Sequence, residues 1–285
     1  MASFFDKEKL LKIANGVLST TTPNESFIQI ANKYKALATQ IKSKEQINQW
    51  TAEQTENKIT DVITSIDNIQ MIMLSSMFYR NQWLYPFIAS DTRKGEFHNK
   101  DGTISQIDML FEKDYTDYIW TENYQAIELS LVDTKTCAVI LLPSKTTSID
   151  QFVNKLNDNM LNFILNNLHW ERVRFTLPKF EISYNTSLKD SLIQLGMKKP
   201  FESKADFSAI TDHKTLKLDD MIHKTYLKVD EEGTEQTLNP KQRDYMWPTT
   251  KPDAIMTVDR PFIFIIRNKN LGNDHLIMLS KIEQL

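Results

Sequence analysis

Cysteine, glycine and long apolar runs are scarce in this chain of 285 residues, and each shortage excludes a kind of protein. The six glycines form neither G-x-G-x-x-G nor G-x-x-x-x-G-K-[ST], so the sequence does not predict a phosphate-cradling loop. One cysteine excludes an intramolecular disulfide. Because Cys137 lies in the apolar run 137–142, we expect a small buried hydrophobe there rather than a reactive thiol.

Charge and hydropathy exclude two further partners. The net charge of −3 gives no broad basic field, so nucleic acid is not a predicted partner. No apolar run approaches the length of a membrane span, and no membrane partner is expected. The N-terminal residues lack the apolar core of a signal peptide, which predicts a cytoplasmic protein for the sequence as written.

The sequence contains no recognisable catalytic or metal-binding motif. None of the five histidines has a second histidine or cysteine at metal-ligand spacing, and no G-x-S-x-G elbow occurs. Adjacent carboxylates such as Glu231 and Glu232 point to opposite faces of a strand, so they suit surface charge better than acid–base chemistry. We therefore predict no catalytic residue, no metal and no cofactor, and do not expect an enzyme.

Hydrophobic periodicity predicts a mixture of helices and strands rather than a strict alternation, which favours the α+β class. Proline with a polar cap at 22–25 predicts a helix that extends to Leu37. The alternation over 172–182 slips at Pro178, which indicates a bulge or bend. The other expected helices are 43–63, 149–165 and 187–195. The expected strands are 10–19, 69–78, several within 97–142, 216–229, 262–267 and 276–282.

One stretch near the C-terminus has an unusual layout. A predicted strand over 217–228 runs into the segment Val229–Glu235, which contains a Gly-Thr pair. About thirty polar residues punctuated by proline follow, up to Arg260. A short apolar run over 261–266 then predicts a buried strand. A strand, a glycine hinge, a long exposed segment and a second core strand thus follow one another.

These features, with several short motifs in the same order, make the chain similar to the serpin family. The hinge Glu231–Glu235 follows Met221-Ile222-His223-Lys224, as in the family's strand 5A. The other matching motifs are Gln46–Trp50 with Thr55–Ile59 (helix F), Phe78–Trp83 with Pro86-Phe87 (strand 3A), Leu177–Phe180, Leu195–Met197 with Pro200-Phe201, Ala205–Ser208 and Asp259–Phe262. The resemblance extends from about Leu10 to the C-terminus.

The resemblance implies an α+β serpin-like fold: a large central, mostly antiparallel sheet A, sheets B and C, flanking helices and an exposed reactive-centre loop. It implies a single domain over 1–285 that lacks the family's helices A to C or D, with the loop at 233–260. It also implies an inhibitor of serine, or sometimes cysteine, endopeptidases. The protease cuts the loop, and the loop then inserts into sheet A as a new strand.

The resemblance also assigns the site residues. The reactive-loop hinge is Glu231, Glu232, Gly233, Thr234 and Glu235, in which glycine permits the turn and threonine is small enough to be buried. The positions of the family's sheet gate are His223, Ser75 and Trp83. Ser75 stands where the family has asparagine.

The reactive bond has several candidates. Family spacing from the hinge places it at Trp247-Pro248, whereas counting back from Pro261 points to Thr250-Lys251. Further candidate recognition residues are Arg243, Tyr245 and Met246.

Departures after the hinge support an alternative function. Gln236 and Leu238 are large for a strand that must pack into a sheet, and Pro240 lacks a backbone donor. The alternative is a non-inhibitory, protein-binding serpin scaffold. Without the first helices, apolar sheet surface would be uncovered, so oligomerisation is possible. By family analogy the protein could be extracellular, and its Lys/Asn/Ile/Thr-rich composition suggests a virus or protist.

Overall fold

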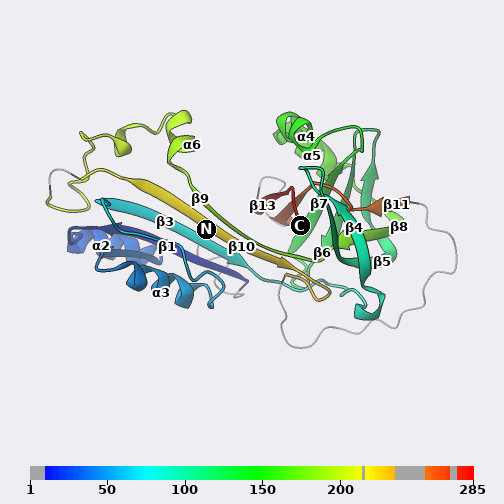
Figure 1. Ribbon diagram of the computed structural model, residues 1–285, viewed down its shortest axis with the longest axis horizontal. Coiled ribbons are helices and arrows are strands. Elements are labelled where there is room, and N and C mark those ends of the chain that lie inside the picture. Colours follow the sequence, from blue (N-terminus) through cyan, green and yellow to red (C-terminus); the bar gives the residue numbers. More distant parts are fainter. Residues whose placement is uncertain (1–9, 214–215, 235–253, 270–274) are drawn as a thin grey trace. The chain divides into compact units, whose positions relative to one another are not determined.

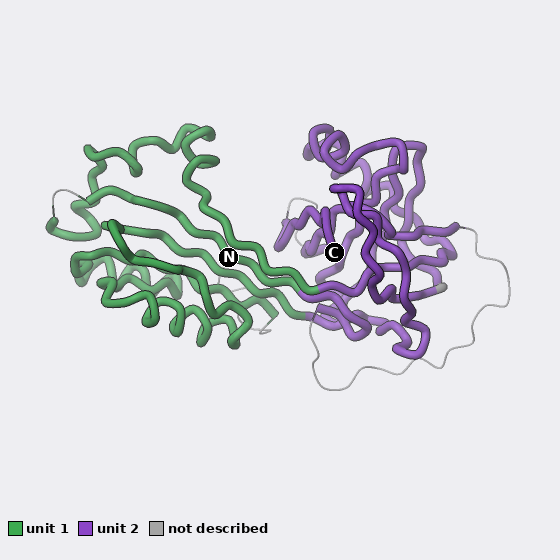
Figure 2. The backbone as a smooth tube through the Cα atoms, in the orientation of Figure 1, with its two compact units in different colours: residues 1–80, 181–227 green, residues 81–180, 228–285 purple. Residues whose placement is uncertain are grey.

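The computed structural model describes residues 10–213, 216–234, 254–269 and 275–285 (Figure 1). The chain divides into two compact units, residues 1–80 with 181–227 and residues 81–180 with 228–285 (Figure 2). Each unit combines two separate segments, so the chain passes between the units three times. The assignment of 1–285 to a single domain stays a prediction.

The first unit is built on a five-stranded sheet with the strand order β2-β1-β3-β10-β9. Strand β1 is antiparallel to β3, whereas β1 with β2 and β3 with β10 are parallel. Its elements are β1 (Leu11–Ser19), α2 (Glu25–Lys33), β2 (Ala36–Gln40), α3 (Lys44–Gln54), β3 (Met71–Tyr79), β9 (Phe180–Ser187), α6 (Lys189–Gln194), η2 (Lys199–Phe201) and β10 (Asp220–Val229).

Helix α3 covers one face of this sheet because alternate strand residues are apolar. Ile72, Leu74 and Phe78 of β3 are buried in one cluster with Ile47 of α3. The residues between them on β3, such as Ser75, point to the opposite face and are half-buried. This alternation fixes which β3 side chains face the helix.

Two helices of the first unit end earlier than the sequence predicted. The helix expected to reach Leu37 stops at Lys33, because Lys35 adopts a positive φ of 55° and residues 36–40 then pair with β1. The helix expected over 43–63 stops at Gln54, where Glu56 and Asn57 have positive φ. Tertiary pairing and packing override the apolar periodicity at both points.

The second unit is built on an eight-stranded sheet with the order β11-β8-β5-β6-β7-β12-β13, to which β4 adds by pairing with β5. Strand β5 pairs with β4 and β8 along one part of its length and with β6 at its end, so the predicted sheets B and C are two parts of one sheet. The elements are η1 (Ala89–Asp91), β4 (Arg93–His98), β5 (Ile104–Trp120), β6 (Tyr124–Ser130), β7 (Thr136–Pro143), α4 (Ile149–Lys155), α5 (Asp158–Asn166), β8 (His169–Pro178), β11 (Ala254–Thr257), β12 (Phe262–Asn268) and β13 (Leu276–Ile282).

Helices α4 and α5 pack their apolar residues on this sheet, against β7 and β12 among others. The sequence predicted one helix over 149–165, but the side chain of Asn157 accepts a hydrogen bond from the Met160 amide and begins a second helix. The same core contains Cys137, which is fully buried as predicted. Burial is the main cause that raises the pKa of its thiol far above the ordinary value.

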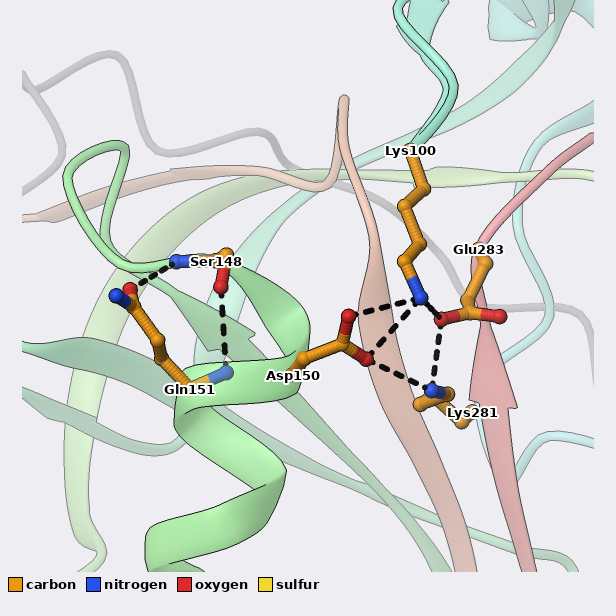
Figure 3. A network of polar contacts seen from close by, with 6 residues as sticks. All are labelled: Lys100, Ser148, Asp150, Gln151, Lys281 and Glu283. Atoms are coloured by element: carbon orange, nitrogen blue, oxygen red, sulfur yellow. Dashed lines mark hydrogen bonds and ion pairs between the residues drawn. The ribbon is translucent and has the colours of Figure 1, made fainter.

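A network of ion pairs links Lys281 and Glu283, near the C-terminus, to the rest of the second unit (Figure 3). Lys100, in the β4–β5 connection, and Lys281, on β13, each contact both Asp150 of α4 and Glu283 at 2.6–3.0 Å. Ser148 and Gln151 form a capping box at the start of α4 beside this network. The network therefore joins three parts of the second unit that are distant in sequence.

Candidate functional site

Strand β10 ends in a tight turn that the side chain of Asp230 closes. Its Oδ1 accepts hydrogen bonds from the amides of Glu232 at 3.0 Å and Gly233 at 3.2 Å. The amide of Asp230 donates to the carbonyl of Gly233 at 2.9 Å, and Lys228 forms an ion pair with Oδ2. An Asx-type turn of this kind uses the aspartate carboxylate to satisfy the backbone donors of a short reversal.

Gly233 sits where no other residue fits. It forms an antiparallel bridge with Gln82 and has a φ of +144°, a conformation that side chains rarely adopt. A Cβ atom at this position would lie 2.3 Å from the carbonyl oxygen of Asn81 and 2.6 Å from the Cα of Gln82. Both atoms belong to the backbone and cannot rotate away, so the close approach requires glycine.

Thr234 is fully buried next to Gly233. Its amide donates to the carbonyl of Asn81 at 2.8 Å, and its hydroxyl accepts from the Asn81 amide at 2.7 Å. The Asn81 side chain in turn donates to Thr136 at the start of β7. The first two residues of the predicted loop are thus hydrogen-bonded to the segment that follows β3 in the chain.

Glu231 is held by a lysine and a threonine. Lys179 forms an ion pair with its carboxylate at 2.8 Å, and the Thr92 hydroxyl donates to the other oxygen at 2.9 Å. Burial alone would raise the pKa of Glu231, but the hydrogen bond from Lys179 and the other donors outweigh burial and lower the pKa. Its carbonyl also accepts from the Phe87 amide.

Trp83 stabilises the turn by donating two hydrogen bonds to it. Its amide donates to the carbonyl of Glu232 and its indole Nε1 to the carbonyl of Asp230, each at 2.9 Å. The indole is almost fully buried and meets the ring of Phe87 edge-on. Trp83 therefore belongs to the hinge in this structure.

The other two predicted gate residues, His223 and Ser75, are brought together in the first unit. They stand directly opposite each other in the parallel register of β10 and β3. Both are half-buried on the face of the sheet that points away from α3. The structure thus pairs His223 with Ser75 and places Trp83 in the second unit, with the hinge.

Several predicted site residues lie outside the described part of the chain. These are Glu235, Arg243, Tyr245, Met246, Trp247, Pro248, Thr250 and Lys251. At the far end of the predicted loop 233–260, residues 254–257 form strand β11, which pairs in parallel with β8. The sequence did not predict this strand, because four residues carry too little periodicity to stand out.

Sequence reasoning also missed Asp230, Asn81 and Lys179 as hinge residues. One signal was available: aspartate three residues before a glycine is a common turn pattern. Asn81 and Lys179 contact the hinge from segments about 150 and 50 positions away in sequence. Such long-range partners leave no local signal.

Within the described ranges, His, Cys, Asp and Glu form no group suited to hold a metal ion. The helices in this same part of the chain are too short or too polar to cross a membrane.

Comparison with known proteins gives a consistent family. The family model described as Serpin (serine protease inhibitor) matches residues 2–282. An uncharacterized serpin-like protein of Thermococcus kodakarensis is 30% identical over 80% of this chain and 53% of its own length. Iripin-8 of Ixodes ricinus is 28% identical over 85% of this chain and 61% of its own. The plasma serine protease inhibitor of Mus musculus is 28% identical over 84% and 58%.

Solved structures agree on the fold. The native state of tengpin, a thermophilic serpin, has a TM-score of 0.87 at 23% identity and covers 100% of this chain and 77% of its own. A serpin from the trematode Schistosoma haematobium has a TM-score of 0.84 at 25% identity, with 97% and 74% covered. The chain spans between 53% and 61% of the length of the three relatives above.

Proposed function

Because the chain belongs to the serpin family, we propose that the protein inhibits a serine or cysteine endopeptidase through the segment that follows Thr234. The family consists of protease inhibitors rather than enzymes. The observation that carries the proposal is the hinge: Gly233 and Thr234 are hydrogen-bonded beside Asn81 and Gln82 in the antiparallel sense. The expected partner is therefore a protease that cuts the chain beyond this hinge.

The proposed mechanism adds a strand between β3 and β10. These two strands are paired in parallel from Ile72–Asp220 to Phe78–Tyr226. A cut segment that continues from Thr234 in the direction of the Gly233–Gln82 bridge runs antiparallel to both strands. One parallel ladder is then replaced by two antiparallel ladders, which are more stable per residue. The exchange supplies the driving force for trapping the protease.

Residues just beyond the hinge set how far this insertion proceeds. Thr234 is buried, so residues 236, 238 and 240 follow on the same side of an inserted strand. Gln236 and Leu238 are larger than threonine, and Pro240 removes one donor from the new ladder. We infer that insertion is slow or incomplete in this protein, and that replacing all three residues by alanine accelerates it.

The test is incubation of the full chain with trypsin-, chymotrypsin-, elastase- and papain-like proteases, followed by denaturing gels. A covalent complex that survives SDS supports inhibition. Thr234→Arg should abolish the complex, because a long charged side chain cannot occupy a fully buried position, and its melting temperature measures how far the uncut protein is destabilised. Thr234→Ser keeps the hydroxyl and is the matched control.

Mass spectrometry of the cut chain identifies the reactive bond. Cleavage after Trp247 supports the spacing counted from the hinge, and cleavage after Thr250 supports the spacing counted back from Pro261. Cleavage at one of the other recognition residues would identify that residue instead; these are Arg243, Tyr245, Met246 and Lys251. Cleavage with no complex from any protease would contradict the inhibitory proposal and favour the non-inhibitory, protein-binding scaffold.

A further inference from the structure

The second unit contains a hollow where strand β6 leaves strand β5. The two strands are paired only from Asp117–Glu128 to Trp120–Gln125. The end of β6 pairs instead with residues 82–84, through the bridge between Trp83 and Leu131 and the hydrogen bond from the Leu84 amide to the Ser130 carbonyl. The space between β5 and this segment is therefore not closed by a ladder. Its lining includes Trp83, Phe87, Tyr115, Asp117, Glu128 and Trp170.

An aromatic platform stands at this hollow. The rings of Tyr115 and Trp170 stack with centroids 6.1 Å apart and an interplanar angle of 11°. They are nevertheless 43% and 67% exposed, which is unusual for two large aromatic side chains in contact. Stacked rings with an open face attract cations through their negative π-surfaces.

A carboxylate lies on the same strand face as this platform. Asp117 is two residues from Tyr115 on β5 and directly opposite Trp170 on β8. It is half-buried, and its carboxylate makes no hydrogen bond or ion pair with the described residues. A carboxylate beside stacked rings is the combination that holds an ammonium or guanidinium group.

The neighbouring charge is unfavourable for Asp117 as it stands. Asp117 is paired across β5 and β6 with Glu128, and like charges directly opposite each other destabilise a sheet. Burial raises the pKa of Asp117 and the charge of Glu128 raises it further, whereas the charges of Lys269, Arg267 and His169 lower it without reversing the shift. Glu128 itself is neutralised by Arg267 and Lys269, both at 2.6 Å. A cation beside Asp117 would favour the charged form of this half-buried carboxylate.

We propose that Tyr115, Trp170 and Asp117 form a binding site for a guanidinium or ammonium group, which stacks on the two rings and pairs with the carboxylate. This site is independent of the proposed inhibitory function. The group could come from a free organic cation or from an arginine side chain of another protein. In both cases the site recognises a singly charged guanidinium or ammonium group.

The experiment titrates the full chain with ethylguanidinium and with its neutral isostere ethylurea, using calorimetry. We expect saturable binding of ethylguanidinium only. A blocked Gly-Ser-Arg-Ser-Gly peptide and its citrulline counterpart form the second arm. Tighter binding of the arginine peptide than of ethylguanidinium assigns the site to a protein partner, whereas equal affinity assigns it to a free cation.

Matched variants test the residues. Asp117→Asn should weaken ethylguanidinium binding by about tenfold or more, because a charge-assisted pair is lost. Trp170→Leu should also weaken it, whereas Trp120→Leu, which removes another tryptophan that is 62% exposed, should not. Melting temperatures of all variants serve as the folding control. Equal binding of ethylurea, or unchanged binding in both Asp117→Asn and Trp170→Leu, would overturn the proposal.

Discussion

At the scale of single residues, the hinge depends on two positions that tolerate almost no change. Gly233 has backbone atoms where any side chain would be, and the hydroxyl of Thr234 replaces a backbone acceptor for the Asn81 amide. The sequence identified both residues through the family resemblance. It could not supply their partners, because contacts across about 150 positions are set by the fold.

Gly233→Ala should lower the free energy of unfolding by about 1–3 kcal/mol, because it combines a strained φ with a clash against the backbone of Asn81. Urea denaturation measures the change. Gly102→Ala is the control: Gly102 has a φ of +86° but open space around it, so only the backbone strain is added. Equal losses in the two variants would show that the close approach to Asn81 contributes nothing.

Thr234→Val keeps the shape of the side chain and removes its hydroxyl. The buried amide of Asn81 then loses its acceptor, which should cost about 1–3 kcal/mol of stability. Thr234→Ser, which retains the hydroxyl, should cost less. Chemical denaturation measures the free energies of unfolding of the wild type and the two variants. A valine variant as stable as the wild type would contradict the role of this hydrogen bond.

At the scale of elements, the sequence predicted which segments form strands better than where helices end. The apolar run of β3 and the alternation in β8 were sufficient to predict that these segments are strands. The predicted irregularity at Pro178 coincides with the end of β8, before β9 begins at Phe180. The helix ends depend on the positive φ of Lys35 and Asn57. These are ordinary polar residues, so their conformation is decided by the packing that surrounds them.

The ion pair between Glu231 and Lys179 links the hinge to the end of β8 and gives a pH dependence. The folded-state pKa of Glu231 is lowered, so the carboxylate contributes stability above its unfolded pKa of about 4.3. That contribution is lost as pH falls through the lower, folded-state pKa. We expect Glu231→Gln to be less stable than the wild type at pH 7, with a difference that disappears in acid. Thermal melting between pH 2 and 7 checks this, and a difference independent of pH would refute it.

At the scale of the whole molecule, each compact unit is assembled from two distant segments. Residues 81–180 alone lack β11, β12 and β13, which complete the eight-stranded sheet. The sequence predicted the serpin fold but not this division, because the boundaries at 180/181 and 227/228 lie within strands β9 and β10. Cutting the chain at these boundaries should therefore not yield either unit in folded form.

The buried ion pair between Glu128 and Arg267 joins the two segments of the second unit, residues 81–180 and 228–285. Glu128 on β6 and Arg267 on β12 are 2.6 Å apart, and both are almost fully buried. Glu128→Ala should destabilise the protein by about 3–5 kcal/mol, because it removes the carboxylate that neutralises the buried guanidinium of Arg267. Calorimetry measures the loss. Replacing the exposed pair Lys94 and Asp108 by alanine is the control and should cost less than about 1 kcal/mol.

Cutting the loop of the intact protein provides the remaining prediction at this scale. If a strand inserts between β3 and β10, the cleaved protein should melt at a higher temperature than the uncut protein. Calorimetry before and after limited proteolysis measures the shift. An unchanged melting temperature would argue against insertion.

The burial of the only thiol has a practical consequence for observing such a change. Cys137 is fully enclosed and its thiol stays protonated at neutral pH, so it should not react with maleimide dyes in the folded protein. A cysteine introduced between Glu235 and Asp253 would then be the single labelled position without removal of the native one. The fluorescence colour and polarisation of a dye attached there would report in real time whether the surroundings of the segment change after it is cut.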